Sequence, residues 1–358
     1  MEKKSTGGNG RFLAGFVITV IAVLVINALF VVYTDPFYQY HAPLGRLPIL
    51  LEEPVYQTAG AARNLEYTDA IVGTSMTENM HTSWFDEEMG WNTIKLSYSG
   101  AKTDDLKEIM GQIFAGDRKV NHIVMDLNEY QLTSPKDQPY VERPEYLYDT
   151  KIWNDRDYLL NFSVTVRGYK VLLAGWKGSG DNTDTAYTWE EENLFGKEIT
   201  LRSARRDKQN ILNATHETRT REDWIEGCQE NLDNILPFIR EHTDTEFIIF
   251  YPPYSVLYWE QKVLSGELED ILAIYEYSIQ TLLQYPNVRI FYFHDEKDII
   301  ENIDNYRDVC HHHPKCNRFI FECIRDGRKE LTIGGTEERS RDLHTYLRDL
   351  DYSLYWEE

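Results

Sequence analysis

The chain has 358 residues, of which 42% are hydrophobic, and a net charge of −22 at pH 7. This length and apolar content suffice for one large α/β domain or two small ones, and they exclude a globally disordered chain. The negative charge argues against nucleic acid as a partner, because phosphate binding requires a basic face. It also argues against a broad electrostatic attraction to anionic lipids or polymers.

The N-terminal segment predicts a membrane anchor. Residues 12–33 are almost wholly apolar, which is long enough to cross a hydrocarbon core of roughly 30 Å as a helix. Lys3, Lys4 and Arg11 precede this run, so the positive-inside rule places residues 1–11 in the cytoplasm and the rest of the chain outside the cell membrane. A cleaved signal peptide is the alternative, but the apolar run is longer than a signal sequence requires and lacks an Ala-x-Ala-like site near its end. We therefore predict an uncleaved, single-pass signal anchor.

Residues 34–66 contain prolines and aromatic residues and predict an extended connector that packs on the following domain. Residues 67–330 then alternate short apolar runs with segments of helical periodicity. The predicted strands are 69–73, 92–97, 120–127, 246–251 and 288–293. The predicted helices are 77–89, 104–114, 158–176, 218–241, 266–285 and one that begins at 318–325.

This alternation implies a mostly parallel sheet with helices on both faces. Five strands favour a flavodoxin-like doubly wound order, that is, an α/β three-layer sandwich with a five-stranded parallel sheet. Residues 134–230 break the rhythm and predict a helical and loop insertion over the open edge of the sheet. We expect its many aromatic side chains to serve core packing in the first place, with a platform for sugars as the alternative. Residues 331–358 predict a charged, peripheral tail.

The four cysteines are Cys228, Cys310, Cys316 and Cys323. Outside the cell a disulfide between Cys310 and either Cys316 or Cys323 is allowed, and the sequence leaves the pairing open. The run Cys310-His311-His312-His313 with Cys316 also suggests zinc, but its spacing matches neither Cys-x-x-Cys pairs nor His-x-x-x-His. We predict no metal and no other cofactor.

The segment 68–79 is the first candidate for a functional site. Its short apolar run ends in Gly73-Thr74-Ser75, and a polar stretch that can begin a helix follows. A serine at this point has its backbone held by the sheet and its hydroxyl at the carboxyl edge, where open α/β sheets bind ligands. The same composition is common in turns and N-caps, so the serine alone does not establish a site.

Four more residues follow the carboxyl ends of predicted strands, and parallel strands bring these ends to one edge. They are Gly100, Asn128, Asp308 and His311. A serine nucleophile needs a base within hydrogen-bond reach, and His311 can supply it because the unperturbed pKa of histidine is near 6.5. Asp308 can orient that imidazole. The N–H groups of Ser75 and Gly100 and the amide of Asn128 can donate to a developing oxyanion.

Each of these positions has a structural alternative. Asp-x-x-His is also an ordinary polar turn, and Asn128 can simply cap a helix. The sequence does not choose among His311, His312 and His313 as the base. Three acidic residues also fall near the predicted crevice and can play polar or structural roles: Glu78, Asp126 and Glu129.

Together these residues resemble the four sequence blocks of the SGNH hydrolase superfamily, also called GDSL-like. Its blocks are a Ser near the N-terminus, a Gly, an Asn and a C-terminal Asp-x-x-His, matched here by Ser75, Gly100, Asn128, Asp308 and His311. The resemblance covers residues 68–325 outside the insertion. The chain departs from the pattern at Thr74, where the first block has Asp. It departs again at Asp126 and Glu129, where the third block has Gly and Asp.

The anchor followed by Asp35-Pro36-Phe37 is similar in layout to membrane-anchored SGNH-like proteins of Gram-positive bacteria. These include the teichoic-acid D-alanyl-transfer proteins and extracytoplasmic polysaccharide O-acetyltransferases. The resemblance implies a serine esterase or O-acyltransferase that acts on cell-envelope glycans or glycopolymers and works with a membrane acyl-transfer partner. It leaves open hydrolysis or transfer, the acyl group and the acceptor. An idle SGNH-like scaffold or binding module in envelope polysaccharide assembly is the alternative, because fold does not imply function.

Overall fold

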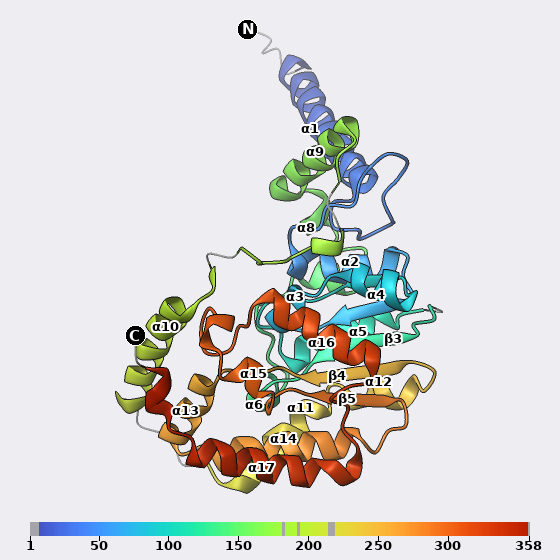
Figure 1. Ribbon diagram of the computed structural model, residues 1–358. Helices are drawn as coiled ribbons and strands as arrows, with labels where there is room; N and C mark the ends of the chain where they lie inside the picture. Colours follow the sequence, from blue (N-terminus) through green and yellow to red (C-terminus); the bar gives the residue numbers. More distant parts are fainter. Residues whose placement is uncertain (1–6, 117, 181–182, 192–193, 214–218, 357–358) are drawn as a thin grey trace. The chain divides into compact units, whose positions relative to one another are not determined.

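The computed structural model describes residues 7–116, 118–180, 183–191, 194–213 and 219–356 (Figure 1). The chain divides into two compact units. The N-terminal unit consists of residues 1–65 and 143–182, and the sheet unit consists of residues 66–142 and 183–358. The predicted insertion, residues 134–230, is therefore divided between the two units instead of forming one layer over the sheet.

The N-terminal unit begins with one long apolar helix, α1 (Gly7–Thr34) (Figure 1). Its segment Gly10–Thr34 is long and apolar enough to cross a membrane, and its side chains are mostly exposed. This matches the predicted apolar span at residues 12–33 in length and composition. Lys3 and Lys4, on which the predicted orientation depends, lie outside the described residues.

Four shorter helices complete this unit: α2 (Pro54–Asn64), α7 (Glu145–Tyr148), α8 (Arg156–Leu159) and α9 (Phe162–Lys177). The predicted helix 158–176 is two helices because Asn161 caps the second one. The Asn161 side chain accepts hydrogen bonds from the N–H groups of Ser163 and Val164. Helix α9 ends at Gly178, which has φ = +66°.

The predicted connector begins with a tight turn around Asp35. Its carboxylate accepts hydrogen bonds from the N–H groups of Gln39, Tyr40 and His41, at 2.7 to 3.0 Å, and from the hydroxyl of Tyr158. The core of the unit lies beside this turn and contains Val31, Phe37, Leu147, Tyr158 and Val164. Burial raises the pKa of Asp35 although these hydrogen bonds lower it. The connector is therefore a folded part of the N-terminal unit.

The sheet unit contains five parallel strands in the order β2-β1-β3-β4-β5. They are β1 (Asp69–Val72), β2 (Thr93–Lys95), β3 (His122–Asp126), β4 (Glu246–Tyr251) and β5 (Val288–Tyr292). All five predicted strands are present at their predicted positions. Their apolar, largely β-branched and aromatic side chains are almost all buried, as in parallel sheets covered on both faces.

Helices lie on both faces of this sheet (Figure 1). On one face, α4 (Thr82–Met89) contacts α16 (Pro314–Asp326) through the rings of Trp84, Phe85 and Phe321. On the other face, α11 (Arg221–Leu232) packs against α5 (Thr103–Ile113) and α14 (Leu268–Leu282). The remaining α-helices are α3 (Ser75–Glu78), α6 (Glu129–Thr133), α10 (Lys197–Asn213), α12 (Leu236–Glu241), α13 (Val256–Ser265), α15 (Lys297–Ile300) and α17 (Thr336–Asp349). Short 3₁₀ turns are η1 (Thr183–Thr185), η3 (Ile303–Asn305), η4 (Ile333–Gly335) and η5 (Tyr352–Tyr355).

Two predicted segments differ from the structure. The helix expected over residues 218–241 is interrupted between α11 and α12, and its first residue lies outside the described residues. The C-terminal tail, expected to be peripheral, forms α17, which packs on α14 with Leu343 and Leu347 buried. Those leucines are one helical turn apart, so they form one apolar edge in an otherwise charged sequence.

All four cysteines are free. The disulfide that the sequence allowed between Cys310 and Cys316 or Cys323 is absent, which corrects that expectation. The reason is their placement. Cys316 and Cys323 point from α16 into the buried core, whereas Cys310 lines a surface cavity.

Candidate active site

The turn after β1 presents Ser75 at the carboxyl edge of the sheet. Strand β1 ends at Val72, and Ser75 is the first residue of α3. Thr74 is the N-cap of this helix, and its hydroxyl accepts a hydrogen bond from the N–H of Met76 at 3.2 Å. From α16, the Asn317 amide donates to the carbonyl of Met76 at 2.6 Å. The serine is thus held from both sides of the turn.

Asp126, at the end of β3, stabilises the same turn through its carboxylate. Its carboxylate accepts hydrogen bonds from the N–H and the hydroxyl of Thr74, at 2.7 and 2.8 Å, and from the Asn128 amide at 2.8 Å. Burial raises the pKa of Asp126, and these three hydrogen bonds oppose that rise. A Cβ atom at Gly73 would lie 2.3 Å from the Asp126 carboxylate, so the close approach requires glycine.

Ser75, His311 and Asp308 form a continuous hydrogen-bonded chain. The Ser75 Oγ lies 2.9 Å from His311 Nε2, and His311 Nδ1 lies 2.7 Å from Asp308 Oδ2. The other Asp308 oxygen accepts the N–H groups of Cys310 and His311 at 2.9 and 2.8 Å. With the ring proton on Nδ1 toward Asp308, Nε2 is free to accept the serine hydroxyl.

The pKa of Asp308 is lowered in these surroundings. Burial alone raises it, but the hydrogen bonds and charge of His311 and the Cys310 N–H outweigh that effect. Asp308 is therefore a carboxylate that can stabilise an imidazolium on its neighbour.

Of the two adjacent histidines, one is buried and the other caps a helix. His312 is buried, and burial lowers its pKa to about 4, so the ring is neutral. His313 is the N-cap of α16, and its Nδ1 accepts the N–H of Lys315 at 3.1 Å. The sequence did not choose among these three histidines as the base. In the structure, His311 is the one that shares a hydrogen bond with Ser75.

A cavity of about 550 Å³ opens beside this chain. Its lining includes all five residues that the sequence placed at the site, together with nine others. The full set is Thr74, Ser75, Met76, Ser99, Gly100, Asn128, Tyr130, Tyr140, Trp189, Tyr254, Arg307, Asp308, Cys310 and His311. Ser75 itself is only 8% exposed, so its hydroxyl is reached through the cavity.

Gly100 and Asn128 line the cavity beside Ser75. Gly100 has φ = +76°, and a Cβ there would lie 2.6 Å from the ring of Tyr140. Asn128 is also the N-cap of α6, accepting the N–H of Gln131 at 3.2 Å. Asn128 therefore both caps a helix, as the alternative interpretation predicted, and lines the cavity. Its side-chain oxygen makes the cap, and its side-chain NH₂ group donates to Asp126.

Trp189 and Arg307 are two cavity residues that the sequence reasoning did not single out. The Trp189 indole donates to Glu78 at 2.8 Å and meets the His311 ring edge-on, at 5.5 Å between centroids. The Arg307 guanidinium lies over the Trp189 ring at 5.2 Å. Trp189 belongs to the aromatic-rich insertion, and Arg307 directly precedes Asp308, but neither position carries a pattern that marks it.

The three acidic residues noted near the crevice play distinct roles. Asp126 holds the serine turn, as described above. Glu78 accepts the Ser99 hydroxyl at 2.8 Å in addition to the Trp189 indole, and its burial raises its pKa. Glu129 points to α13, where it contacts Tyr258 and pairs with Lys262 at 2.6 Å.

Cys310 places a thiol in the cavity lining. Burial raises the pKa of its thiol well above the usual value, so it is a neutral thiol and a weak nucleophile at neutral pH. In the part of the chain that the structure describes, no group of three His, Cys, Asp or Glu side chains is placed to hold a metal ion.

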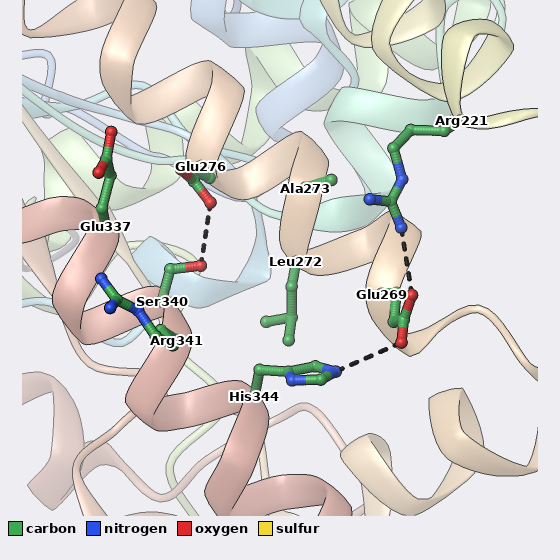
Figure 2. Close-up of a pocket in the computed structure, with 9 residues that line it drawn as sticks. All are labelled: Arg221, Glu269, Leu272, Ala273, Glu276, Glu337, Ser340, Arg341 and His344. Atoms are coloured by element: carbon green, nitrogen blue, oxygen red, sulfur yellow. Dashed lines mark hydrogen bonds and ion pairs between the residues drawn. The ribbon is translucent and has the colours of Figure 1, made fainter.

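A second cavity, of about 460 Å³, lies between α14 and α17 (Figure 2). Several of its polar groups pair with one another. Glu269 contacts Arg221 at 3.4 Å and His344 at 3.7 Å, and Ser340 donates to Glu276 at 3.3 Å (Figure 2). Its serine faces a carboxylate and not an imidazole, so this cavity lacks the pairing that activates a nucleophile.

In comparisons with known proteins, no protein-family model and no curated protein sequence matches this chain.

Proposed function

We propose that this protein is a membrane-anchored, extracytoplasmic serine esterase or O-acyltransferase acting on cell-envelope glycans or glycopolymers. The observation that carries the proposal is the chain of hydrogen bonds from Ser75 through His311 to Asp308, at 2.9 and 2.7 Å, beside an open cavity. The order β2-β1-β3-β4-β5 supports an SGNH-like layout, since it is the strand order of flavodoxin-like sheets.

The proposed reaction begins with attack of Ser75 Oγ on the carbonyl carbon of an acyl ester or thioester. The hydroxyl proton passes to His311 Nε2, and Asp308 stabilises the resulting imidazolium. The negative charge on the carbonyl oxygen is stabilised by donors from the N–H groups of Ser75 and Gly100 and the Asn128 amide. The carbon–oxygen or carbon–sulfur bond then breaks, and the leaving group takes the proton from His311.

The acyl group is now an ester of Ser75. An acceptor hydroxyl enters the cavity, loses its proton to His311 Nε2 and attacks the acyl carbon. The bond to Ser75 Oγ then breaks, and His311 returns the proton to that oxygen, which restores the free enzyme. Water as the acceptor makes the enzyme an esterase, and a sugar hydroxyl makes it an acyltransferase. Trp189, Tyr130 and Tyr140 line the cavity and provide aromatic faces on which a sugar ring can stack.

The proposal is tested by covalent labelling of the full-length protein in detergent with a fluorophosphonate. We expect one adduct on Ser75, found by peptide mass spectrometry, and its loss in Ser75→Ala. Ser340→Ala is the matched control, because Ser340 lines the other cavity and should leave labelling intact. A protein that stays unlabelled while a control serine hydrolase reacts would instead favour the idle scaffold.

A further inference from the structure

Helix α9 carries an apolar stripe that the protein does not cover. Its members are Phe162, Val166, Tyr169, Leu173 and Trp176, all exposed, with Phe162 at 81% and Trp176 at 84%. At about 100° per residue, this spacing places all five within an arc of roughly 80° on one face of the helix. Such a continuous exposed face of large apolar side chains marks an interaction surface.

The rest of α9 is occupied by contacts within the N-terminal unit. Val164 and Val171 are buried. On the polar side, Arg167 and Lys170 pair with Glu52 at 2.9 and 3.3 Å. These contacts fix the rotation of α9 about its own axis, and as a result the apolar stripe faces outward.

The stripe lies next to α1, which contacts α9 directly (Figure 1). The rings of Tyr169 and Phe30 are in contact in a tilted arrangement, with 4.6 Å between centroids. Asn27 of α1 accepts a hydrogen bond from the Thr165 hydroxyl at 3.1 Å. Gly168 permits the close approach, because a Cβ there would lie 2.6 Å from the Thr34 hydroxyl.

These contacts fix the depth of α9 along α1. They involve residues 27–34, the last two turns of the apolar helix, so they span about 10 Å at 1.5 Å per residue. Helices that lie in a membrane interface bury their apolar face about 5–10 Å below the headgroups. Just before α9, Ile152 and Trp153 are also exposed, at 81% and 74%. Tryptophan and tyrosine are the residues enriched at this depth of a bilayer.

We infer that α9 is an interfacial membrane helix, whose apolar stripe lies in the lipid bilayer at the level where α1 leaves it. The occupant of the stripe is lipid and not protein, because the stripe continues the exposed apolar surface of α1. The net charge of −22 indicates that apolar burial, and not attraction to anionic headgroups, holds the helix there. The inference rests on the proposed membrane anchor but is independent of the proposed chemistry at Ser75.

The test is site-specific photo-crosslinking of the full-length protein in phosphatidylcholine vesicles. A benzoylphenylalanine replaces Val166 or Leu173 in the stripe. Matched positions on the same helix are Ser163 and Lys170, about 80–100° around from the centre of the stripe. Ile18, on α1, reports the anchor itself. We expect phospholipid adducts at positions 166 and 173 as at 18, and a marked loss of adduct at 163 and 170.

Three results would overturn the inference, and each has a different meaning. Adducts at Ile18 without adducts at 166 and 173 would leave α1 as the anchor and remove α9 from the bilayer. Crosslinks at 173 to a second copy of the chain would make the stripe a protein interface. Absence of lipid adducts at Ile18 would remove the anchor on which the inference depends, while fluorophosphonate labelling of Ser75 would still report the chemistry separately.

Discussion

Two carboxylates near Ser75, the buried Asp126 and the half-buried Asp308, have pKa shifts of opposite sign, which fits different roles. Asp308 accepts three hydrogen bonds, from the His311 ring and from the N–H groups of Cys310 and His311, and together with the charge of His311 they outweigh its burial, so its pKa is lowered. Asp126 meets only neutral donors from Thr74 and Asn128, and burial raises its pKa. A carboxylate beside the base can stabilise the imidazolium that forms during the reaction, whereas one among neutral donors serves to hold geometry.

The first residue-scale prediction concerns the proton path. His311→Ala should reduce acyl transfer or hydrolysis by on the order of 10²–10⁴-fold, the usual contribution of a general acid–base residue. Asp308→Ala should cause a smaller loss, because it orients the base and does not carry the proton. The measurement is turnover of p-nitrophenyl esters, with and without a glycan acceptor.

The matched control for this experiment is His313→Asn. Asparagine retains the capping of α16 and His313 does not line the cavity, so turnover should be close to that of the parent chain. Loss of turnover in His313→Asn with full activity in His311→Ala would contradict the assignment of the base.

A second residue-scale prediction concerns Lys95, which is buried at the end of β2. Its ammonium donates to the carbonyls of Glu78, Ala186 and Asp184 at 2.7, 3.0 and 3.3 Å. Burial lowers its pKa from 10.5 to about 7. Between these two pH values the unfolded chain binds more protons, so the folding stability contributed by Lys95 rises with pH.

The difference in unfolding free energy between the parent chain and Lys95→Met should therefore grow from pH 7 to pH 10, by up to about 1.4 kcal/mol per pH unit. Denaturant unfolding in detergent, followed by tryptophan fluorescence, measures it. Lys107→Met is the control for replacing a lysine by methionine, because Lys107 is a surface residue paired with Asp137. If the difference between the parent chain and Lys95→Met did not change with pH, Lys95 would have the same pKa in the folded and the unfolded chain, which would contradict the prediction.

At the scale of elements, the site depends on short loops that leave the carboxyl ends of β1, β2 and β3. The first two of these loops are each held by a side chain from another element. Asp126 at the end of β3 holds the β1 loop, and Glu78 in α3 holds Ser99 of the β2 loop. Lys95 bonds the carbonyls of the segment that leads to Trp189. The cavity wall therefore consists of loops that are joined to one another by hydrogen bonds and supported by the sheet.

Gly100 and Gly90 offer a matched test of one such loop. Both have φ near +75°, but a Cβ at Gly100 would meet the Tyr140 ring, whereas at Gly90 it would meet nothing within 4 Å. Alanine at either position carries backbone strain of roughly 1–2 kcal/mol. Only Gly100→Ala should also displace Tyr140 and lower kcat/KM.

Thermal unfolding and ester hydrolysis of the two variants separate these effects. We expect both variants to lose a similar amount of stability. Only Gly100→Ala should also show a lower kcat/KM. Equal kcat/KM in both variants would indicate that the Gly100 loop does not shape the path of the substrate.

At the scale of the whole molecule, the parallel sheet brings together residues that are 236 positions apart, Ser75 and His311. The sheet unit carries this site, and the N-terminal unit carries the long apolar helix. The large negative charge argues against a charge-based attraction to nucleic acid or to anionic lipid, so apolar burial of α1, and of the α9 stripe under the inference above, is the membrane contact that we propose.

The anchor is tested by replacing Ile21 and Leu24, near the middle of α1, with arginine. Each arginine at the centre of a spanning helix costs about 2.5–3.5 kcal/mol, so the double variant should leave the carbonate-washed membrane fraction. Ile21→Val with Leu24→Ile is the control and should remain. An N-terminal tag retained on the membrane-bound protein is expected for an uncleaved anchor, and its loss would instead indicate a cleaved signal peptide.

Much of the sheet unit could be predicted from its sequence because the relevant signals are local. Short apolar runs between turn residues predict buried strands, and β1, β3, β4 and β5 lie at such runs. The remaining strand, β2, is the three-residue segment Thr93–Lys95. The candidate site was predicted from residues that follow the carboxyl ends of strands and from the resemblance to one superfamily. Its members are Ser75, Gly100, Asn128, Asp308 and His311. The strand-end rule holds because every parallel strand ends at the same edge.

What only the tertiary structure decided depends on contacts between distant residues. The choice of His311 over its two neighbours arises from how the loop after η3 meets the β1 turn. Trp189 and Arg307 join the cavity through contacts with Glu78 and with each other, which no local pattern encodes. The Asp35 turn depends on Tyr158, 123 residues away. Local sequence determines which residues can form a strand or begin a helix, but side-chain partners across the fold are selected by packing, and packing is a property of the whole chain.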